Sequence, residues 1–137
     1  MVGALLRLPH EAVVARIQAA LDVAGFDISP TELGVFLYPG PDGRRPADLA
    51  RQCNMTRQAM NYVLAGLENR GYLERHDACD HAGRVVHPTA RGRAMYAVIR
   101  GAVVDVEREW SALVGARRFE TLRETLRDLA VGLGKLD

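Results

Sequence analysis

The stretch from Pro46 to Gly71 constrains this chain most, because it holds two short helical patterns separated by a tight break. Pro46 suits the first position of a helix, where a missing N–H loses no partner. Asn54 tolerates a positive φ and can therefore turn the chain. Thr56 can cap the next helix by accepting a backbone N–H. The pattern predicts a helix-turn-helix, whose second helix ordinarily lies in the major groove of DNA.

The second helix of this pair has one apolar and one polar face. The apolar residues recur at helical spacing: Met60, Val63, Leu64 and Leu67. The cap and the polar face supply the candidate DNA-binding residues: Thr56, Arg57, Gln58, Asn61 and Tyr62. Arginine can donate two bonds to guanine, asparagine and glutamine can pair with adenine, and tyrosine can reach a phosphate or a thymine methyl. The alternative is an ordinary polar face in contact with solvent.

Length and composition indicate one domain, or one domain with helical extensions, since the chain has 137 residues of which 48% are hydrophobic. No run approaches the roughly 18 apolar residues of a membrane span. The first residues, MVGALLRLPHE, are too weakly charged and too short for a secretory signal. We therefore expect a cytoplasmic protein with no membrane contact.

The charge is unevenly distributed, although the net charge is only +1. From Arg44 to Arg93 there are nine arginines and five carboxylates, whereas the rest of the chain has nine basic residues and twelve acids. The positive charge is concentrated around the helix-turn-helix, as binding to phosphates requires.

A β-hairpin is expected after Gly71, because residues 72–76 and 84–87 alternate around a polar tip. A hairpin in this position is a wing, which can contact the minor groove or the backbone of DNA. The wing candidates are His81 and Arg84, and Arg45, in the Gly-rich loop before the helix-turn-helix, is a candidate phosphate contact.

Amphipathic helices are expected on both sides of this core, from Pro9 to Ala24, from Ala90 to about Val114 and from Ala116 to Leu133. Pro9 is placed at the start of the first, with three exposed leucines before it. A helix as long as 90–114 cannot bury its apolar stripe alone, so we expect the terminal helices to form a dimer interface. The alternative is a monomer in which they fold back on the core.

The order of elements and several residues resemble the MarR family of winged-helix transcriptional regulators. The resemblance rests on Leu49-Ala50, on Leu67–Arg75 (LENRGYLER), on Asp80, and on Thr89-Ala90-Arg91-Gly92 (TARG). It covers roughly residues 9–133. The chain departs from the family pattern at Ala82, where the family has an arginine that enters the minor groove, and at Pro88, where a leucine is usual.

The resemblance implies a mainly α fold with a small β-hairpin wing. Residues 1–28 would form an N-terminal dimerisation helix, 29–89 a winged helix-turn-helix DNA-binding core, and 90–137 C-terminal dimerisation helices. It further implies a homodimer on a pseudo-palindromic operator of double-stranded DNA. Such proteins usually repress transcription until a small, often aromatic or phenolic, effector releases them.

Other functions are weighed against this one. Cys53, at the turn before the second helix, could sense oxidants as a thiolate beside Arg51 and Arg57, or be a small buried hydrophobe. His76, Cys79 and His81 have zinc-ligand chemistry but number only three, so we expect no metal and no cofactor. No catalytic constellation is present, which argues against an enzyme. A winged helix used only for protein contact remains an alternative.

Overall fold

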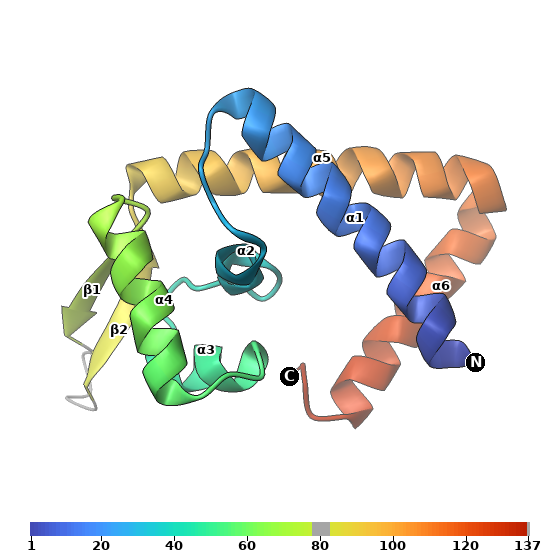
Figure 1. The fold of residues 1–137 in the computed structure, drawn as a ribbon. Coiled ribbons are helices and arrows are strands. Elements are labelled where there is room, and N and C mark those ends of the chain that lie inside the picture. Colours follow the sequence, from blue (N-terminus) through green and yellow to red (C-terminus); the bar gives the residue numbers. More distant parts are fainter. Residues whose placement is uncertain (78–82, 137) are drawn as a thin grey trace. The chain divides into compact units, whose positions relative to one another are not determined.

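The structure, a computed structural model, describes residues 1–77 and 83–136. Six helices and one hairpin follow one another in these residues: α1 (Val2–Ala24), α2 (Pro30–Phe36), α3 (Pro46–Gln52), α4 (Arg57–Asn69), β1 (Leu73–Asp77), β2 (Arg84–Pro88), α5 (Ala90–Val114) and α6 (Ala116–Gly132). Figure 1 shows this order along the chain. The predicted fold class, a mainly helical chain with a winged helix-turn-helix, is confirmed.

The chain divides into two compact units. The winged unit comprises residues 18–99, and the terminal unit comprises residues 1–17 together with 100–137. The functional division predicted from the sequence, at residues 28 and 89, stays a prediction. None of the helices in the described ranges is both long enough and apolar enough to cross a bilayer.

The first helix starts earlier than the sequence predicted. Pro9 lies inside α1, which begins at Val2 rather than at Pro9. The residues before Pro9 are mostly good helix formers such as Ala, Leu and Arg, and a proline within a helix removes one backbone hydrogen bond to the residue four positions earlier. The leucines at positions 5, 6 and 8 are therefore helical, although they remain exposed as expected.

The core of the winged unit is built from one face of each of its helices and from the hairpin. Ser29 and Glu32 form a capping box at the start of α2, which fixes where this helix begins. The fully buried side chains of this unit come from α1 to α5, from the turn before β1 and from β2: Leu21, Leu33, Val35, Phe36, Leu49, Met60, Leu64, Leu67, Tyr72, Val86 and Met95. This core holds α4 against the elements that flank it.

The wing is an antiparallel pair in which Leu73 lies opposite Pro88 and Asp77 opposite Arg84. Arg44 adds an isolated bridge to Val86 on the other side of β2, with Val86 N donating to Arg44 O at 2.9 Å. The loop before α3 therefore adds a short edge to the hairpin at Arg44. This edge ties the loop before α3 to the hairpin.

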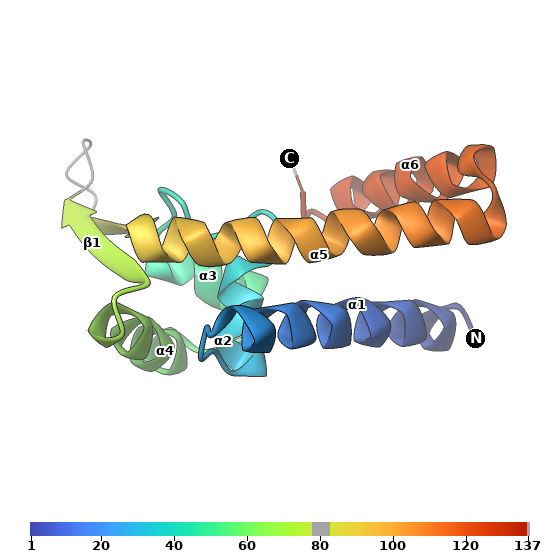
Figure 2. The same cartoon turned by 90° about the horizontal axis from the view of Figure 1, so that it is seen from above.

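Helix α4, the β1–β2 hairpin and helix α5 meet at one joint. Gly71 ends the α4 region with a φ of 78°, and Thr89 Oγ1 donates to Gly71 O at 2.5 Å. Thr89 N donates to Tyr72 O at 3.1 Å, while Gly92 N donates to Thr89 Oγ1 at 3.1 Å. Figure 2 shows the hairpin leading directly into α5 at this point.

The terminal unit has a small core of its own. Among its described residues only three hydrophobic side chains are buried: Ile17, Val106 and Phe119. Arg16 donates to both carboxylate oxygens of Glu109, at 2.7 and 2.9 Å. Most of the remaining large apolar side chains of this unit are exposed.

The joint generates a prediction about Gly92. A Cβ on Gly92 would lie 2.1 Å from Tyr72 O and 3.2 Å from the Pro88 side chain. We expect Gly92→Ala to reduce the free energy of unfolding by about 1–3 kcal/mol or more, as overpacking does. Urea unfolding at fixed protein concentration measures it.

Gly101→Ala is the matched control, because Gly101 lies in the same helix and its added Cβ would meet nothing within 4 Å. Helix propensity predicts that Gly101→Ala raises the free energy of unfolding by about 1 kcal/mol. Equal effects of the two substitutions would contradict the close approach at Tyr72.

Candidate nucleic-acid interface

Helix α4 is set in place at its first residue and along its inner face. Asn54 turns the chain after α3 with a φ of 54°. Thr56 then caps α4, its side chain accepting from Ala59 N at 3.1 Å. Met60 and Leu64 are fully buried on the inner face. Sequence reasoning predicted each of these features, and they fix which side of the helix faces outward.

The outer face of α4 presents the predicted recognition residues to solvent. Thr56, Arg57, Gln58, Asn61 and Tyr62 are all exposed. Tyr62 is 84% exposed, and Arg57 has no hydrogen bond or ion pair with any residue that the structure describes. An exposed arginine in the first turn, without an internal partner, is free to bind a phosphate or a guanine.

A groove of about 920 Å³ runs along one side of this face. It lies between the first turn of α2 and α4, and Met55, Thr56, Gln58, Tyr62 and Val63 are among the residues that line it. Three of the predicted recognition residues, Thr56, Gln58 and Tyr62, therefore line this groove.

Two basic residues near α4 are engaged within the protein. Arg70 pairs with Glu32 of α2 and donates to Asp27 O at 2.8 Å. Arg44 donates to Gln52 Oε1 at 3.0 Å. Both arginines contribute to the positive charge of this region, but they act as internal ties between elements.

The wing is braced against α4 by Arg75 of β1. Arg75 Nε donates to Glu68 Oε1, and its Nη1 donates to Asn61 Oδ1 at 3.4 Å. Arg75 is 21% exposed and Glu68 31%. The sequence motif contained both residues, but it gave no sign that they pair, or that Asn61 belongs to the same network.

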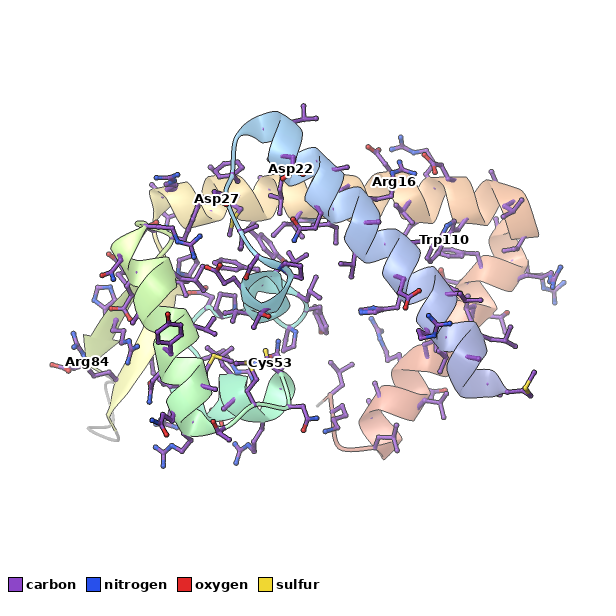
Figure 3. All side chains as sticks on the ribbon, viewed as in Figure 1. Arg16, Asp22, Asp27, Cys53, Arg84 and Trp110 are labelled. Atoms are coloured by element: carbon purple, nitrogen blue, oxygen red, sulfur yellow. The ribbon has the colours of Figure 1, made fainter. Side chains whose placement is uncertain are left out.

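Arg84 lies at the start of β2, where it is exposed (Figure 3). Its Nη2 donates to Arg75 O at 3.0 Å, and its Nε lies 3.8 Å from Asp77 Oδ1. Both interactions are at the surface, so Arg84 can exchange them for a phosphate. The other wing candidate, His81, lies outside the described residues, as do Cys79, Asp80 and Ala82.

Arg45 is half-buried at the N-cap position of α3, beside the bridge that Arg44 makes to the hairpin. Its predicted phosphate contact stays a prediction.

Cys53 lies at the corner between α3 and α4 (Figure 3). Burial raises the pKa of its thiol. The positive charge of Arg44 lowers it, but by less, so the pKa remains raised. The expected cations, Arg51 and Arg57, do not contribute. A raised pKa leaves less thiolate at neutral pH, which argues against a reactive cysteine.

The described residues contain no group of three or more His, Cys, Asp or Glu side chains that could hold a metal ion. Of the three zinc-type residues noted in the wing, only His76 is described, and it contacts the ring of His87 edge-on at 5.3 Å. His87 in turn binds Asp42 through Nδ1 at 2.8 Å.

Comparison with known proteins gives one consistent family. The MarR family model matches residues 26–84. A Mycobacterium tuberculosis MarR-family protein, Rv2887, in complex with p-aminosalicylic acid, is 30% identical, with 95% of this chain and 98% of that chain covered and a TM-score of 0.62. No curated protein matches the chain.

Two further solved structures share the fold at lower identity. The transcriptional repressor CouR, bound to a 23-mer DNA duplex, is 22% identical, with 95% and 92% of the two chains covered and a TM-score of 0.71. NadR in complex with 4-hydroxyphenylacetate is 22% identical over the same shares, with a TM-score of 0.73.

Proposed function

The chain belongs to the MarR family of transcriptional regulators, and from this premise we propose that it binds a specific double-stranded DNA operator through the outer face of α4. The observation that carries the proposal is the set of exposed polar residues on α4, a helix that is capped by Thr56 and anchored by its buried inner face. Among these residues, Arg57 has no hydrogen bond or ion pair with any described residue. Thr56, Gln58, Asn61 and Tyr62 would complete the contact with base edges and phosphates. Arg84, Arg45 and His81 would bind the backbone beside it.

The proposed active form is a homodimer joined through the terminal unit. This unit buries little of its apolar surface within one chain, and its exposed large apolar residues are Met1, Val2, Leu5, Leu6, Leu8, Val104, Leu113, Val114, Leu122, Leu126, Leu129, Val131 and Leu133. Exposed apolar surface on this scale marks an interaction site. A second copy is the proposed partner because two identical helix-turn-helix units match the two halves of a pseudo-palindromic operator.

We further propose repression that is relieved by a small aromatic effector. The support is that the 30% identical relative was solved with p-aminosalicylic acid and with salicylic acid, and NadR with 4-hydroxyphenylacetate. An effector can change operator affinity only if it binds one state of the dimer more tightly than the other.

Two rival functions predict different behaviour. A winged helix used only for protein contact would show no salt-dependent affinity for DNA, whereas phosphate contacts always produce one. A redox sensor at Cys53 would need a stabilised thiolate, and burial acts in the opposite direction. The absence of enzymatic activity and the cytoplasmic location stay predictions.

DNA binding is tested by fluorescence anisotropy with labelled duplexes at about 50 and 200 mM salt, since phosphate contacts weaken as salt rises. An operator obtained by in vitro selection then serves to compare variants. Arg57→Ala should weaken operator binding by about 1–3 kcal/mol if Arg57 reads a base.

Arg118→Ala is the control for that experiment, because Arg118 is an exposed arginine on α6, in the terminal unit. It should leave operator affinity nearly unchanged. No binding even at low salt would favour the protein-contact function, and unchanged affinity of the Arg57 variant alone would remove Arg57 from the site.

The dimer is tested by sedimentation at micromolar concentration, where a single species of twice the chain mass is expected. Leu126→Glu and Leu129→Glu place a charge among the exposed apolar residues of α6, and each should shift the protein towards monomer. Val23→Glu changes an apolar residue of the winged unit that is even more exposed, at 91% against 39% for Leu126 and 51% for Leu129, and it should not shift the protein towards monomer. A monomeric wild-type protein would contradict the interface.

The effector class is tested by repeating the operator titration with saturating salicylate. A coupling of about 1–3 kcal/mol between effector and DNA, which is typical of allosteric systems, would weaken operator binding by roughly 5- to 150-fold. Salicylamide, which lacks the carboxylate charge, is the control. An unchanged operator Kd with bound salicylate would argue against this effector class.

A further inference from the structure

We infer that Arg75 fixes the orientation of the Asn61 amide, so that Asn61 selects a keto base, guanine or thymine, at its position in the operator. The inference deepens the proposed function and rests on it. Its basis is the brace between α4 and β1, in which Asn61 and Glu68 occupy two turns of one helix face and both accept from the same guanidinium.

The Asn61 amide turns its oxygen, not its nitrogen, towards Arg75. A guanidinium carries five N–H donors and no acceptor. The amide atom beside Arg75 Nη1, 3.4 Å away, must therefore be Oδ1. Rotating the amide by 180° would place its N–H₂ group against the N–H groups of the cation, which is repulsive.

Arg75 is itself held in place. Its Nε donates to Glu68, seven residues after Asn61 on the same helix. Its backbone carbonyl accepts from Arg84 Nη2 at 3.0 Å, and its residue is paired with Val86 in the hairpin. The guanidinium is thus held by Glu68 of α4, and the backbone of Arg75 is held by the other strand of the wing, which lies beside α4 in Figure 1.

In this orientation Asn61 can offer only hydrogen-bond donors to DNA. With Oδ1 directed to Arg75, the free edge of the amide presents N–H₂ donors. A bidentate contact with adenine needs both the amide oxygen, to accept from N6, and the amide nitrogen, to donate to N7. Guanine offers two acceptors, N7 and O6, and thymine offers O4, so a donor-only edge favours these bases.

This inference changes the expectation drawn from residue type alone, which paired asparagine with adenine. Asn61 is the residue that would touch the base, and Arg75 is a positioning residue that acts through it. The structure thereby links the wing to base selection by α4, since movement of β1 would release the amide.

The test compares base preference at one operator position. The position is identified as the one whose preference disappears in Asn61→Ala during selection from a randomised duplex library. Wild-type affinity is then measured on the operator and on its three single-base variants at that position. We expect guanine or thymine to be preferred over adenine and cytosine by roughly fivefold or more, the lower end of the discrimination of a good base contact.

Two substitutions of Arg75 separate positioning from mere stability. Arg75→Met removes the donors, so the amide can rotate and the keto preference should be lost, with adenine gaining relative to guanine. Arg75→Lys keeps a donor-only group and should retain the keto preference. Asn61→Asp presents only acceptors and should shift the preference to adenine or cytosine. Circular dichroism and thermal unfolding establish that each variant is folded.

The outcomes distinguish this inference from the proposed function. Salt-dependent, specific binding with adenine preferred at the Asn61 position, or a keto preference that survives in folded Arg75→Met, would overturn the inference and leave the function intact. No position affected by Asn61→Ala would also overturn it. Loss of all duplex binding in the wild-type protein would overturn both.

Discussion

The close approach of the Tyr72 carbonyl to Gly92 is the contact on which the winged unit depends. At this point α4 has ended, the wing begins and α5 starts, and one hydroxyl, that of Thr89, binds both Gly71 O and Gly92 N. A side chain at position 92 would overlap the carbonyl. The absence of a Cβ there lets three elements converge, which sets the angle at which α4 presents its outer face.

Tyr72 turns this backbone contact into a packed one. Its ring is fully buried, with the Arg91 guanidinium 4.7 Å from the ring centroid and Phe26 at 6.3 Å. Arg91 also donates to the Tyr72 hydroxyl at 3.3 Å. A buried tyrosine needs such a partner for its hydroxyl, and here the first turn of α5 supplies it.

The arginines of the winged unit differ in whether they are engaged within it. Arg44, Arg70, Arg75 and Arg91 bind other parts of the unit, whereas Arg57 has no partner among the described residues. The local excess of positive charge therefore overstates how many cations can meet phosphates directly. It still favours the approach of DNA, because the field of paired but exposed charges acts over a Debye length of about 10 Å at 0.1 M salt.

The sequence by itself determined the local structure of the winged unit. Caps, turn residues and helical spacing act within a few residues, so Asn54, Thr56 and the apolar face of α4 could be interpreted without coordinates. The same reasoning was wrong at Pro9. This proline was predicted to start the first helix, but it lies inside the longer α1. The polar face of α4 was also predictable, because the inner face was marked by its hydrophobic spacing.

Only the tertiary structure decided which polar side chains are engaged with one another. Arg75 and Glu68 are separated by the end of a helix, a turn and the first residues of a strand, and the angle between these elements is set by long-range packing around Tyr72 and Gly92. The same holds for Arg70 with Glu32, and for Arg44 beside Cys53. Pairing between side chains depends on distances across elements, which residue type and spacing do not contain.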